Sequence, residues 1–309
     1  MTSHAWLKLG TRGSPLALAQ AVETQRRLAQ AHGRDPESIA IVVIKTTGDQ
    51  IQDSALSQAG GKGLFTKELD AAMLEGAIDI AVHSAKDLPT RMPAGIVVAG
   101  YLPREDARDA LISAKAATID ALPLGASLGS ASLRRQAMML RRRPDLKPAL
   151  LRGNVETRLR KVESGEIDVT LLALAGLKRL GLAHRATAIL DIDAFLPAVG
   201  QGAIAITARP GDTAAEAALA PILHAETGQA LAAERAFLDV LDGSCRTPIA
   251  GHARLRGGQL EFQGCILRVD GAQIVEASGA GGAADGARIG LEAGRKIRAA
   301  APADMFVTR

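Results

Sequence analysis

The chain has 309 residues, 47% of them hydrophobic and 2% aromatic, and a formal net charge of +4 at neutral pH. This length is too great for one ordinary core and the composition lacks the signature of disorder, so we expect two or three folded domains. No uncharged apolar run reaches about 18 residues, which argues against a membrane span. The scarcity of aromatic residues argues against a protein that stacks on single-stranded nucleic acid.

Arginine dominates the basic residues, with 27 arginines and 10 lysines. A guanidinium group presents a planar fork of donors that suits a carboxylate or a phosphate, whereas a lysine is a mobile point charge. Small anionic ligands therefore fit this composition better than a polymer does. The start of the chain lacks a basic segment followed by an apolar one, and two cysteines cannot build a disulfide framework. We therefore expect a reduced, cytoplasmic protein.

Helix and strand signals alternate through the first two thirds of the chain. The stretch "SPLALAQAVETQRRLAQAH" predicts a helix over 14–32, with Ser14 as its N-cap and Gly33 as its stop. The β-branched run "IAIVVIKTT" (39–47) follows and predicts a buried strand. A glycine-rich loop then leads to a predicted helix over 64–76.

One pattern occurs twice. "MLEGAIDIAVHS" (73–84) and "VESGEIDVTLLA" (162–173) share the order helix end, glycine, Ile-Asp, apolar strand. Gly76 and Gly165 are expected to end the helices in the left-handed conformation. The repeat predicts two α/β domains of similar construction, each with a mostly parallel sheet.

Interruptions with proline and glycine near residues 100 and 200 are candidate hinges at which the chain enters the second domain and returns to the first. Such a double crossing would leave a ligand-binding cleft between the two. After this point, a helix over 227–241 leads to three short antiparallel strands, joined at Gly257-Gly258 and at Asp270-Gly271, and then to a closing helix. The predicted domains are 1–102 together with 201–220, 103–200, and 221–309.

Three predicted helix starts have arginine beside them, and serine is expected to cap two of these helices, at Ser14 and Ser132. Free backbone N–H groups and the helix dipole favour an anion there, and a nearby guanidinium adds charge-assisted pairs. Ordinary solvated arginine is the alternative for any single site. The residues concerned are Arg12 and Ser14; Ser132, Arg134 and Arg135; and Arg152, Asn154 and Arg158.

"HSAKDLP" (83–89) follows a predicted strand, where open α/β sheets place their ligand chemistry. Lys86 can pair with an anion, and Asp87 can hold a positive charge or pass a proton. His83 is interpreted as a satisfied, partly buried histidine rather than a proton shuttle.

The two cysteines have different surroundings. Cys265 lies within an apolar strand and is expected to be buried, whereas Cys245 lies in the turn "DGSCRTPIAG" beside Arg246, which would lower its pKa. No histidine base and no metal-ligand spacing accompany Cys245, so we expect no metal site. Two interpretations stay open for Cys245: a small core residue, or a sulfur that holds a covalently attached group.

Eight motifs then occur together: "TRGSPLALAQ", "GGKGLFTKELD", "DIAVHSAKDLP", "GSASLRRQ", "LRGNVETRL", "AGLKRLG", "LPAVGQGA" and "GSCRTPIAGHA". In order and spacing, over nearly the whole chain, they resemble the porphobilinogen deaminase family, also called hydroxymethylbilane synthase. The resemblance implies two α/β domains like those of type 2 periplasmic binding proteins, with mixed, mostly parallel sheets. A small α+β domain with a three-stranded antiparallel sheet would follow them.

The resemblance also implies an enzyme that adds four porphobilinogen units head to tail, with release of ammonia, to make hydroxymethylbilane. A dipyrromethane cofactor, made from the enzyme's own substrate, would be held in thioether linkage to Cys245. Asp87 matches the catalytic aspartate. By motif position the cofactor would be held by Cys245, Lys86, Asp87, Ser132, Arg134 and Arg135, and the substrate by Arg12, Ser14, Lys62, Arg152, Asn154 and Arg158.

Two positions depart from the commonest pattern of the family. Ser244 stands where many relatives have glycine, a small change that leaves the role of Cys245 intact. Gln58 stands where some relatives have lysine, so we give it no charge role.

Two other classes of function compete with this interpretation. A non-enzymatic, two-lobed anion-binding protein would share the hinged construction, but the third domain with its cysteine turn counts against it. A nucleic-acid binder would suit the positive charge, but the basic groups are separated along the chain. We expect a monomer that binds a small-molecule substrate, and neither nucleic acid nor a membrane.

Overall fold

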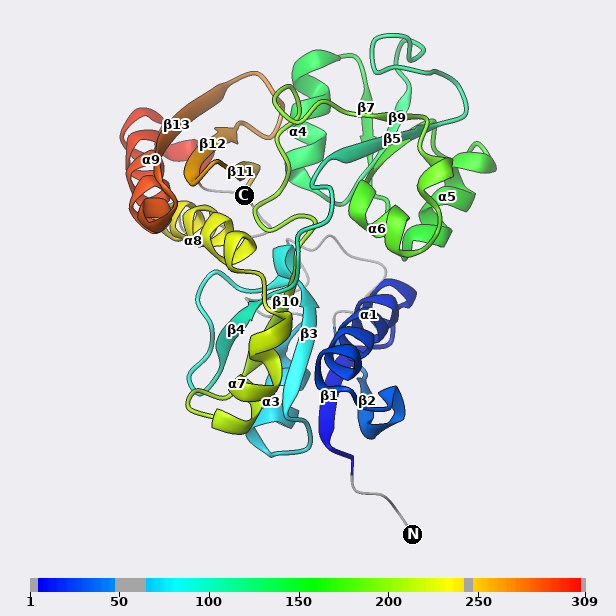
Figure 1. Ribbon diagram of the computed structural model, residues 1–309. Coiled ribbons are helices and arrows are strands. Elements are labelled where there is room, and N and C mark those ends of the chain that lie inside the picture. The colour runs from blue at the N-terminus through cyan, green and yellow to red at the C-terminus, as the bar shows by residue number, and fades with distance from the viewer. Residues whose placement is uncertain (1–4, 48–64, 242–246, 307–309) are drawn as a thin grey trace. The chain divides into compact units, whose positions relative to one another are not determined.

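The computed structural model describes residues 5–47, 65–241 and 247–306, and Figure 1 shows its elements. The chain divides into two compact units. Within the described residues, unit 1 comprises 5–47, 65–105 and 203–228, and unit 2 comprises 106–202, 229–241 and 247–306. None of the helices described is long and apolar enough to cross a lipid bilayer.

Unit 1 is built on a five-stranded sheet with the order β2-β1-β3-β10-β4. β1 pairs in parallel with β2 and β3, whereas β10 is antiparallel to both of its neighbours, so four of the strands point one way. The strands are β1 (Leu7–Arg12), β2 (Ile39–Ile44), β3 (Ile80–Ser84), β4 (Val97–Tyr101) and β10 (Ile204–Ala208), and the helices are α1 (Pro15–His32), α3 (Lys67–Leu74) and α7 (Thr213–Leu219).

The ends of α1 lie where the sequence predicts them. The Ser14 hydroxyl accepts a hydrogen bond from the N–H of Ala17, and Gly33 ends the helix at a φ of 58°. The run 39–47 does contain a strand, β2, but the prediction that this strand is buried is wrong. Among the described strands, β2 is an edge strand that pairs with β1 alone, and Val43 is 51% exposed.

Unit 2 repeats this plan with the sheet order β7-β6-β8-β5-β9, in which β5 is the strand that runs against its neighbours. This confirms the two predicted sheets of like construction, each mixed and mostly parallel. The strands are β5 (Asp109–Ser113), β6 (Ser127–Gly129), β7 (Lys147–Ala149), β8 (Val169–Ala173) and β9 (Ala188–Ile189), and the helices are α4 (Leu133–Arg142), α5 (Val155–Glu163) and α6 (Leu174–Arg179).

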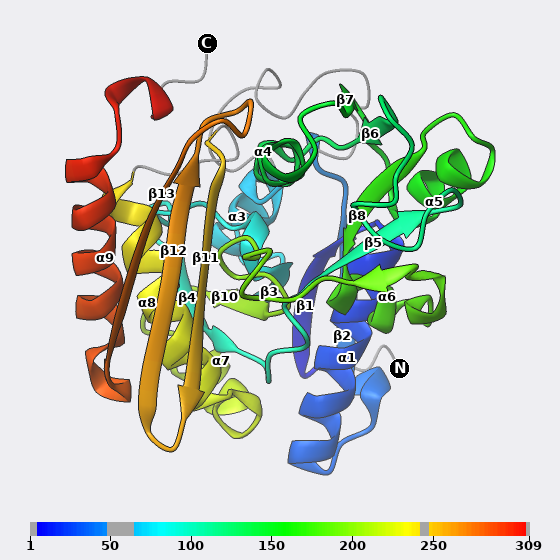
Figure 2. The ribbon, with the colours of Figure 1, turned by 90° about the horizontal axis from the view of Figure 1, so that it is seen from above.

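The third sheet also belongs to unit 2. It is the predicted antiparallel meander of β11 (Ile249–Arg256), β12 (Gln259–Leu267) and β13 (Ile274–Gly282), and Figure 2 shows α9 (Gly286–Ala300) running along it. Apolar side chains of the second and third sheets, such as Leu128 and Cys265, belong to one buried cluster. The three-domain division of the sequence stays a prediction beside these two units.

The helix α8 (Ala225–Val240) packs against α9. The α9 side of this contact consists of three glycines spaced four residues apart, Gly286, Gly290 and Gly294. At the middle one, Gly290, a Cβ atom would overlap the carbonyl oxygen of Ala233 on α8. Glycine at this position therefore allows the two backbones to approach closely.

Candidate active site

The carboxyl ends of β1 and β3 lie at one edge of the first sheet because these strands pair in parallel. Arg12 is the last residue of β1, and Ser14 caps α1 directly after it. β3 runs into a single 3₁₀ turn, Ala85–Asp87, which contains Lys86 and Asp87. The predicted position of Lys86 and Asp87, immediately after a strand, is confirmed.

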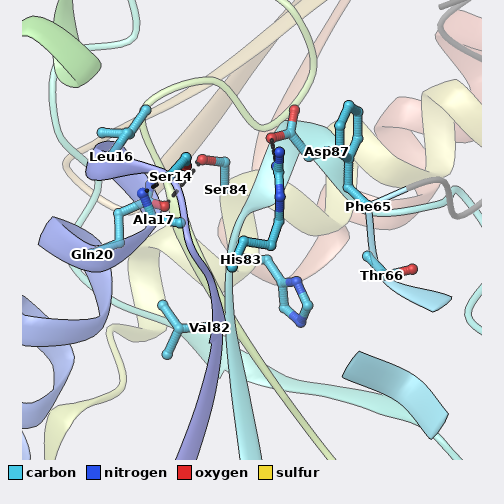
Figure 3. A pocket seen from close by; sticks show the side chains of 11 residues that line it. Ser14, Leu16, Ala17, Gln20, Phe65, Thr66, Val82, His83, Ser84 and Asp87 are labelled. Carbon is cyan, nitrogen blue, oxygen red and sulfur yellow. Dashed lines mark hydrogen bonds and ion pairs between the residues drawn. The ribbon is translucent and has the colours of Figure 1, made fainter. Parts of the chain in front are cut away.

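A small cavity of about 50 Å³ opens at this edge, and Figure 3 shows the side chains around it. Its lining includes Arg12, Ser14, Gln20, Phe65, His83 and Asp87. This volume is that of about one or two water molecules. Within the described residues, the enclosed part of the cavity has room for a carboxylate-sized group.

Arg12 and Asp87 face each other at the cavity, with 3.8 Å between Nη1 and Oδ2. This distance is too long for a hydrogen bond but close enough for strong electrostatic attraction. The Asp87 side chain is 33% exposed and that of Arg12 is 18% exposed, so a ligand can reach both charges. The guanidinium carbon of Arg12 lies 4.2 Å from the centre of the Phe65 ring, a cation–π contact that restricts its position.

Gln20 and Ser84 are polar residues of the cavity that were not foreseen from the sequence. Gln20 Nε2 donates to Ser84 Oγ at 2.9 Å, and the Ser84 hydroxyl lies 3.2 Å from Gln20 Oε1. Gln20 is only 3% exposed. The signal for it was available, because Gln20 places a long polar side chain on the buried face by which α1 packs on the sheet.

His83 lies beneath the cavity and is buried. Its Nε2 is 3.1 Å from the hydroxyl of Thr207 on β10, so the interpretation as a satisfied histidine is confirmed. Burial, assisted by the nearby Arg12 charge, lowers the pKa of His83 to about 4. The imidazole is therefore neutral at physiological pH and is not a proton shuttle there.

The corresponding edge of the second sheet holds further predicted residues. β6 and β7 are parallel neighbours, and α4 and α5 begin shortly after them. Ser132 caps α4 and Asn154 caps α5, each accepting a backbone N–H bond from three residues on. Arg158 Nε donates to the carbonyl of Gly153 at 2.9 Å, while Arg152 is half-buried just before the cap. The helix-start positions are confirmed, and the ligand roles stay predictions.

Arg134 and Arg135, in the first turn of α4, are buried rather than solvated. Both guanidinium groups bind the carboxylate of Asp109, the first residue of β5, with N–O distances of 2.8 and 2.7 Å. Burial alone would raise the pKa of Asp109, but the two cations hold it well below the usual range of a carboxyl group. The sequence pattern predicts an anion beside these arginines. Part of that negative charge is supplied by the protein itself, through Asp109.

Five positions discussed from the sequence lie outside the described residues: Gln58, Lys62, Ser244, Cys245 and Arg246. Cys265 is described, and it is buried and unpaired as predicted. Burial raises the pKa of its thiol to about 12, so it is not a nucleophile.

Residues 7–217 match the family described as "Porphobilinogen deaminase, dipyromethane cofactor binding domain", and residues 229–299 match "Porphobilinogen deaminase, C-terminal domain". A porphobilinogen deaminase of Nitrobacter hamburgensis is 57% identical over 298 residues, which cover 96% of this chain and 94% of that protein. The porphobilinogen deaminase of Paracoccus denitrificans is 52% identical over 300 residues, covering 97% and 96%.

Solved structures of other proteins resemble the chain more distantly. The periplasmic aliphatic sulphonate binding protein SsuA of Escherichia coli matches 78% of this chain and 71% of its own, with a TM-score of 0.41 and 16% identity. A YaeC-family lipoprotein of Enterococcus faecalis matches 72% and 92%, with a TM-score of 0.41 and 12% identity.

Proposed function

The chain belongs to the porphobilinogen deaminase family, and from that premise we propose which of its residues perform the chemistry. The enzyme joins porphobilinogen molecules head to tail, with release of ammonia, into the linear tetrapyrrole hydroxymethylbilane, and it uses a dipyrromethane cofactor. This membership favours an enzyme over the two-lobed anion-binding protein.

Asp87 is the catalytic carboxylate. As ammonia leaves porphobilinogen, the methylene carbon beside the pyrrole becomes electron-poor and positive charge spreads onto the ring and its N–H group. A fixed carboxylate at that N–H stabilises the developing charge more than it stabilises the neutral substrate. The observation that supports this role is the geometry of Asp87, which lines the cavity, is one-third exposed, and faces Arg12 without a hydrogen bond to it.

Arg12 and Ser14 bind a carboxylate of the substrate. Porphobilinogen has acetate and propionate side chains, and the cavity beside Arg12 has the size of one such group. A substrate held there by its carboxylate presents its ring toward Asp87, since Arg12 and Asp87 are 3.8 Å apart. We assign further substrate carboxylates to the remaining predicted residues, Lys62, Arg152, Asn154 and Arg158.

The residues proposed for the cofactor fit an anionic group. Two guanidinium groups, those of Arg134 and Arg135, share the single carboxylate of Asp109, which leaves this buried cluster with an excess positive charge. Among the described residues, Arg134 Nε is buried without a hydrogen-bond partner, as a donor reserved for a ligand would be. When bound, the dipyrromethane supplies a covalently held acceptor to which substrate units are joined. Cys245 anchors it, and Lys86, Asp87 and Ser132 contact it.

We also propose the three-domain division 1–102 with 201–220, 103–200 and 221–309, a monomeric state, and a cytoplasmic location. A reducing compartment is supported by the cysteine content, since Cys265 is an unpaired thiol in the core.

Exchange of the carboxylate for an amide tests the role of Asp87. Asp87→Asn should lower kcat by at least about 10²–10³-fold with a much smaller change in KM, because the lost interaction forms mainly in the transition state. Asp120→Asn is the matched control, since Asp120 pairs with Arg142 on the surface of unit 2 and should leave kcat unchanged. A loss of less than about tenfold in Asp87→Asn would show that the role is misassigned.

Mass spectrometry of the intact protein tests the anchor. The wild type should carry an added mass of two linked pyrroles, Cys265→Ser should keep it, and Cys245→Ser should lose it. An adduct that persists in Cys245→Ser, or a wild type of unmodified mass, would refute the proposed attachment.

A further inference from the structure

Asp109, Arg134, Arg135 and Gln201 form a buried polar cluster in unit 2. Its one carboxylate, that of Asp109, is fully buried. Oδ2 accepts from Arg134 at 2.8 Å, and Oδ1 accepts from Nε and Nη2 of Arg135 at 3.1 and 2.7 Å. Oδ1 also accepts from Gln201 Nε2 at 3.0 Å. Both planar guanidinium groups are therefore oriented by one carboxylate.

The same cluster holds the segment by which the chain leaves unit 2. Arg134 Nη1 donates to the carbonyl of Leu196 at 2.8 Å, and Gln201 Nε2 donates to the carbonyl of Ala107 at 2.7 Å. The Arg134 guanidinium carbon is 5.8 Å from the centre of the Phe195 ring. These contacts leave the Arg134 side chain little freedom to turn.

The charges of this cluster do not balance. Two guanidinium groups face one carboxylate, and an uncompensated charge away from water is costly unless another ion meets it. Burial lowers the pKa of Arg134, against the effect of Asp109, yet an arginine does not deprotonate in a protein. With Arg134 Nε unpartnered among the described residues, the cluster has both a charge and a donor to offer an anion.

We propose that Asp109 is a positioning residue for cofactor binding: it fixes Arg134 and Arg135 so that their excess positive charge and remaining donors receive a carboxylate of the dipyrromethane. This inference rests on the proposed function, which gives the two arginines their ligand. It assigns Asp109 and, through it, Gln201 a part in holding the cofactor without touching it.

A thermodynamic cycle separates positioning from mere structural support. The Tm of cofactor-loaded protein minus the Tm of its Cys245→Ser form measures how much the folded protein gains from its ligand. In Asp109→Asn the Tm gain should be at most about half that of the wild type. The reason is that an amide no longer holds both guanidinium groups in the orientation that binds the cofactor. The fraction of molecules with the two-pyrrole adduct should fall too, and Asp109→Glu, which keeps the charge, should restore part of both.

Glu234 provides the matched control. It is a fully buried carboxylate that accepts from the N–H groups of Gly200 and Ala253, at 2.7 and 2.8 Å, and it lies 3.5 Å from Nδ1 of His252. Through Gly200 it supports the same segment by which the chain leaves unit 2. Glu234→Gln should lower the Tm of loaded and cofactor-free protein equally and leave the gain intact. If Asp109→Asn does not fold, Gln201→Met removes one donor to Asp109 without a change of charge and should also reduce the gain.

The outcomes are distinguishable. A wild type without the adduct would overturn the proposed function itself. A loaded wild type with no Tm gain, or Asp109→Asn and Gln201→Met variants with full occupancy and a wild-type gain, would overturn the role of Asp109 alone.

Discussion

The neutral state of His83 predicts an acid-sensitive contribution to the stability of unit 1. Its pKa is about 4 in the folded protein and 6.5 as the ordinary value. Between these values the unfolded chain binds a proton that the folded chain excludes, so the stability that His83 contributes is complete above pH 6.5 and is lost as the pH falls to 4. At 1.36 kcal/mol per pKa unit, the loss amounts to about 3 kcal/mol.

The assay is urea unfolding at several pH values between 7 and 4, with wild type and His83→Gln compared. Glutamine keeps a polar nitrogen close to the place of Nε2, which lies 3.1 Å from the Thr207 hydroxyl, and it does not titrate. The remaining titratable groups are the same in both proteins. The difference between the two unfolding free energies therefore isolates the contribution of His83. Relative to the variant, the wild type should lose about 3 kcal/mol across this range.

Two results would refute the reasoning. One is a difference in unfolding free energy that stays constant from pH 7 to 4. The other is an NMR titration in which the His83 ring protons change shift with a midpoint near 6.5, since that would place a charged imidazole beside Thr207 and Arg12.

Three further predictions follow from single contacts. Gly290→Ala should destabilise unit 2 by about 1–3 kcal/mol in thermal unfolding, because the added methyl group meets the Ala233 backbone. Gly228→Ala is the control and should be neutral or stabilising, because the space around its Cβ is open. Equal effects of the two substitutions would contradict the close packing of α8 and α9. Cys265 should resist iodoacetamide at pH 8 until the protein unfolds, because its thiol pKa is raised to about 12; rapid labelling of native protein, read by mass, would be inconsistent with this burial. Arg12→Gln should raise KM for porphobilinogen by about 10–100-fold. Arg12→Lys should raise KM less, because it keeps the positive charge but loses the guanidinium fork and the contact with the Phe65 ring. An unchanged KM in Arg12→Gln would show that Arg12 is not part of the substrate site.

Elements set by local chemistry could be predicted from the sequence. The limits of α1 follow from a serine cap and a glycine stop, which act within one turn of the chain. The third sheet follows from the Asp270-Gly271 turn between two alternating runs. The position of Asp87 after its strand and that of Arg12 before α1 follow from the same kind of signal.

Features that depend on contacts distant in sequence could not be predicted. Asp109 precedes Arg134 by 25 residues, and only the pairing of β5 with β8 brings it to the edge where α4 begins. The exposure of β2 is likewise a property of strand order, because a β-branched run reads the same in a central and an edge strand. The role of Cys245 stays a prediction, since it lies outside the described residues.

The position of β10 has a consequence for synthesis on the ribosome. β10 separates β3 from β4 in the first sheet, yet residues 204–208 are translated after every strand of the second sheet, all of which lie within 109–189. Until β10 emerges, β4 has no strand beside it, whereas the second sheet already has its full set. Although most nascent proteins fold from the N-terminus onward, the unit that contains the N-terminal strand here is the one whose sheet closes late.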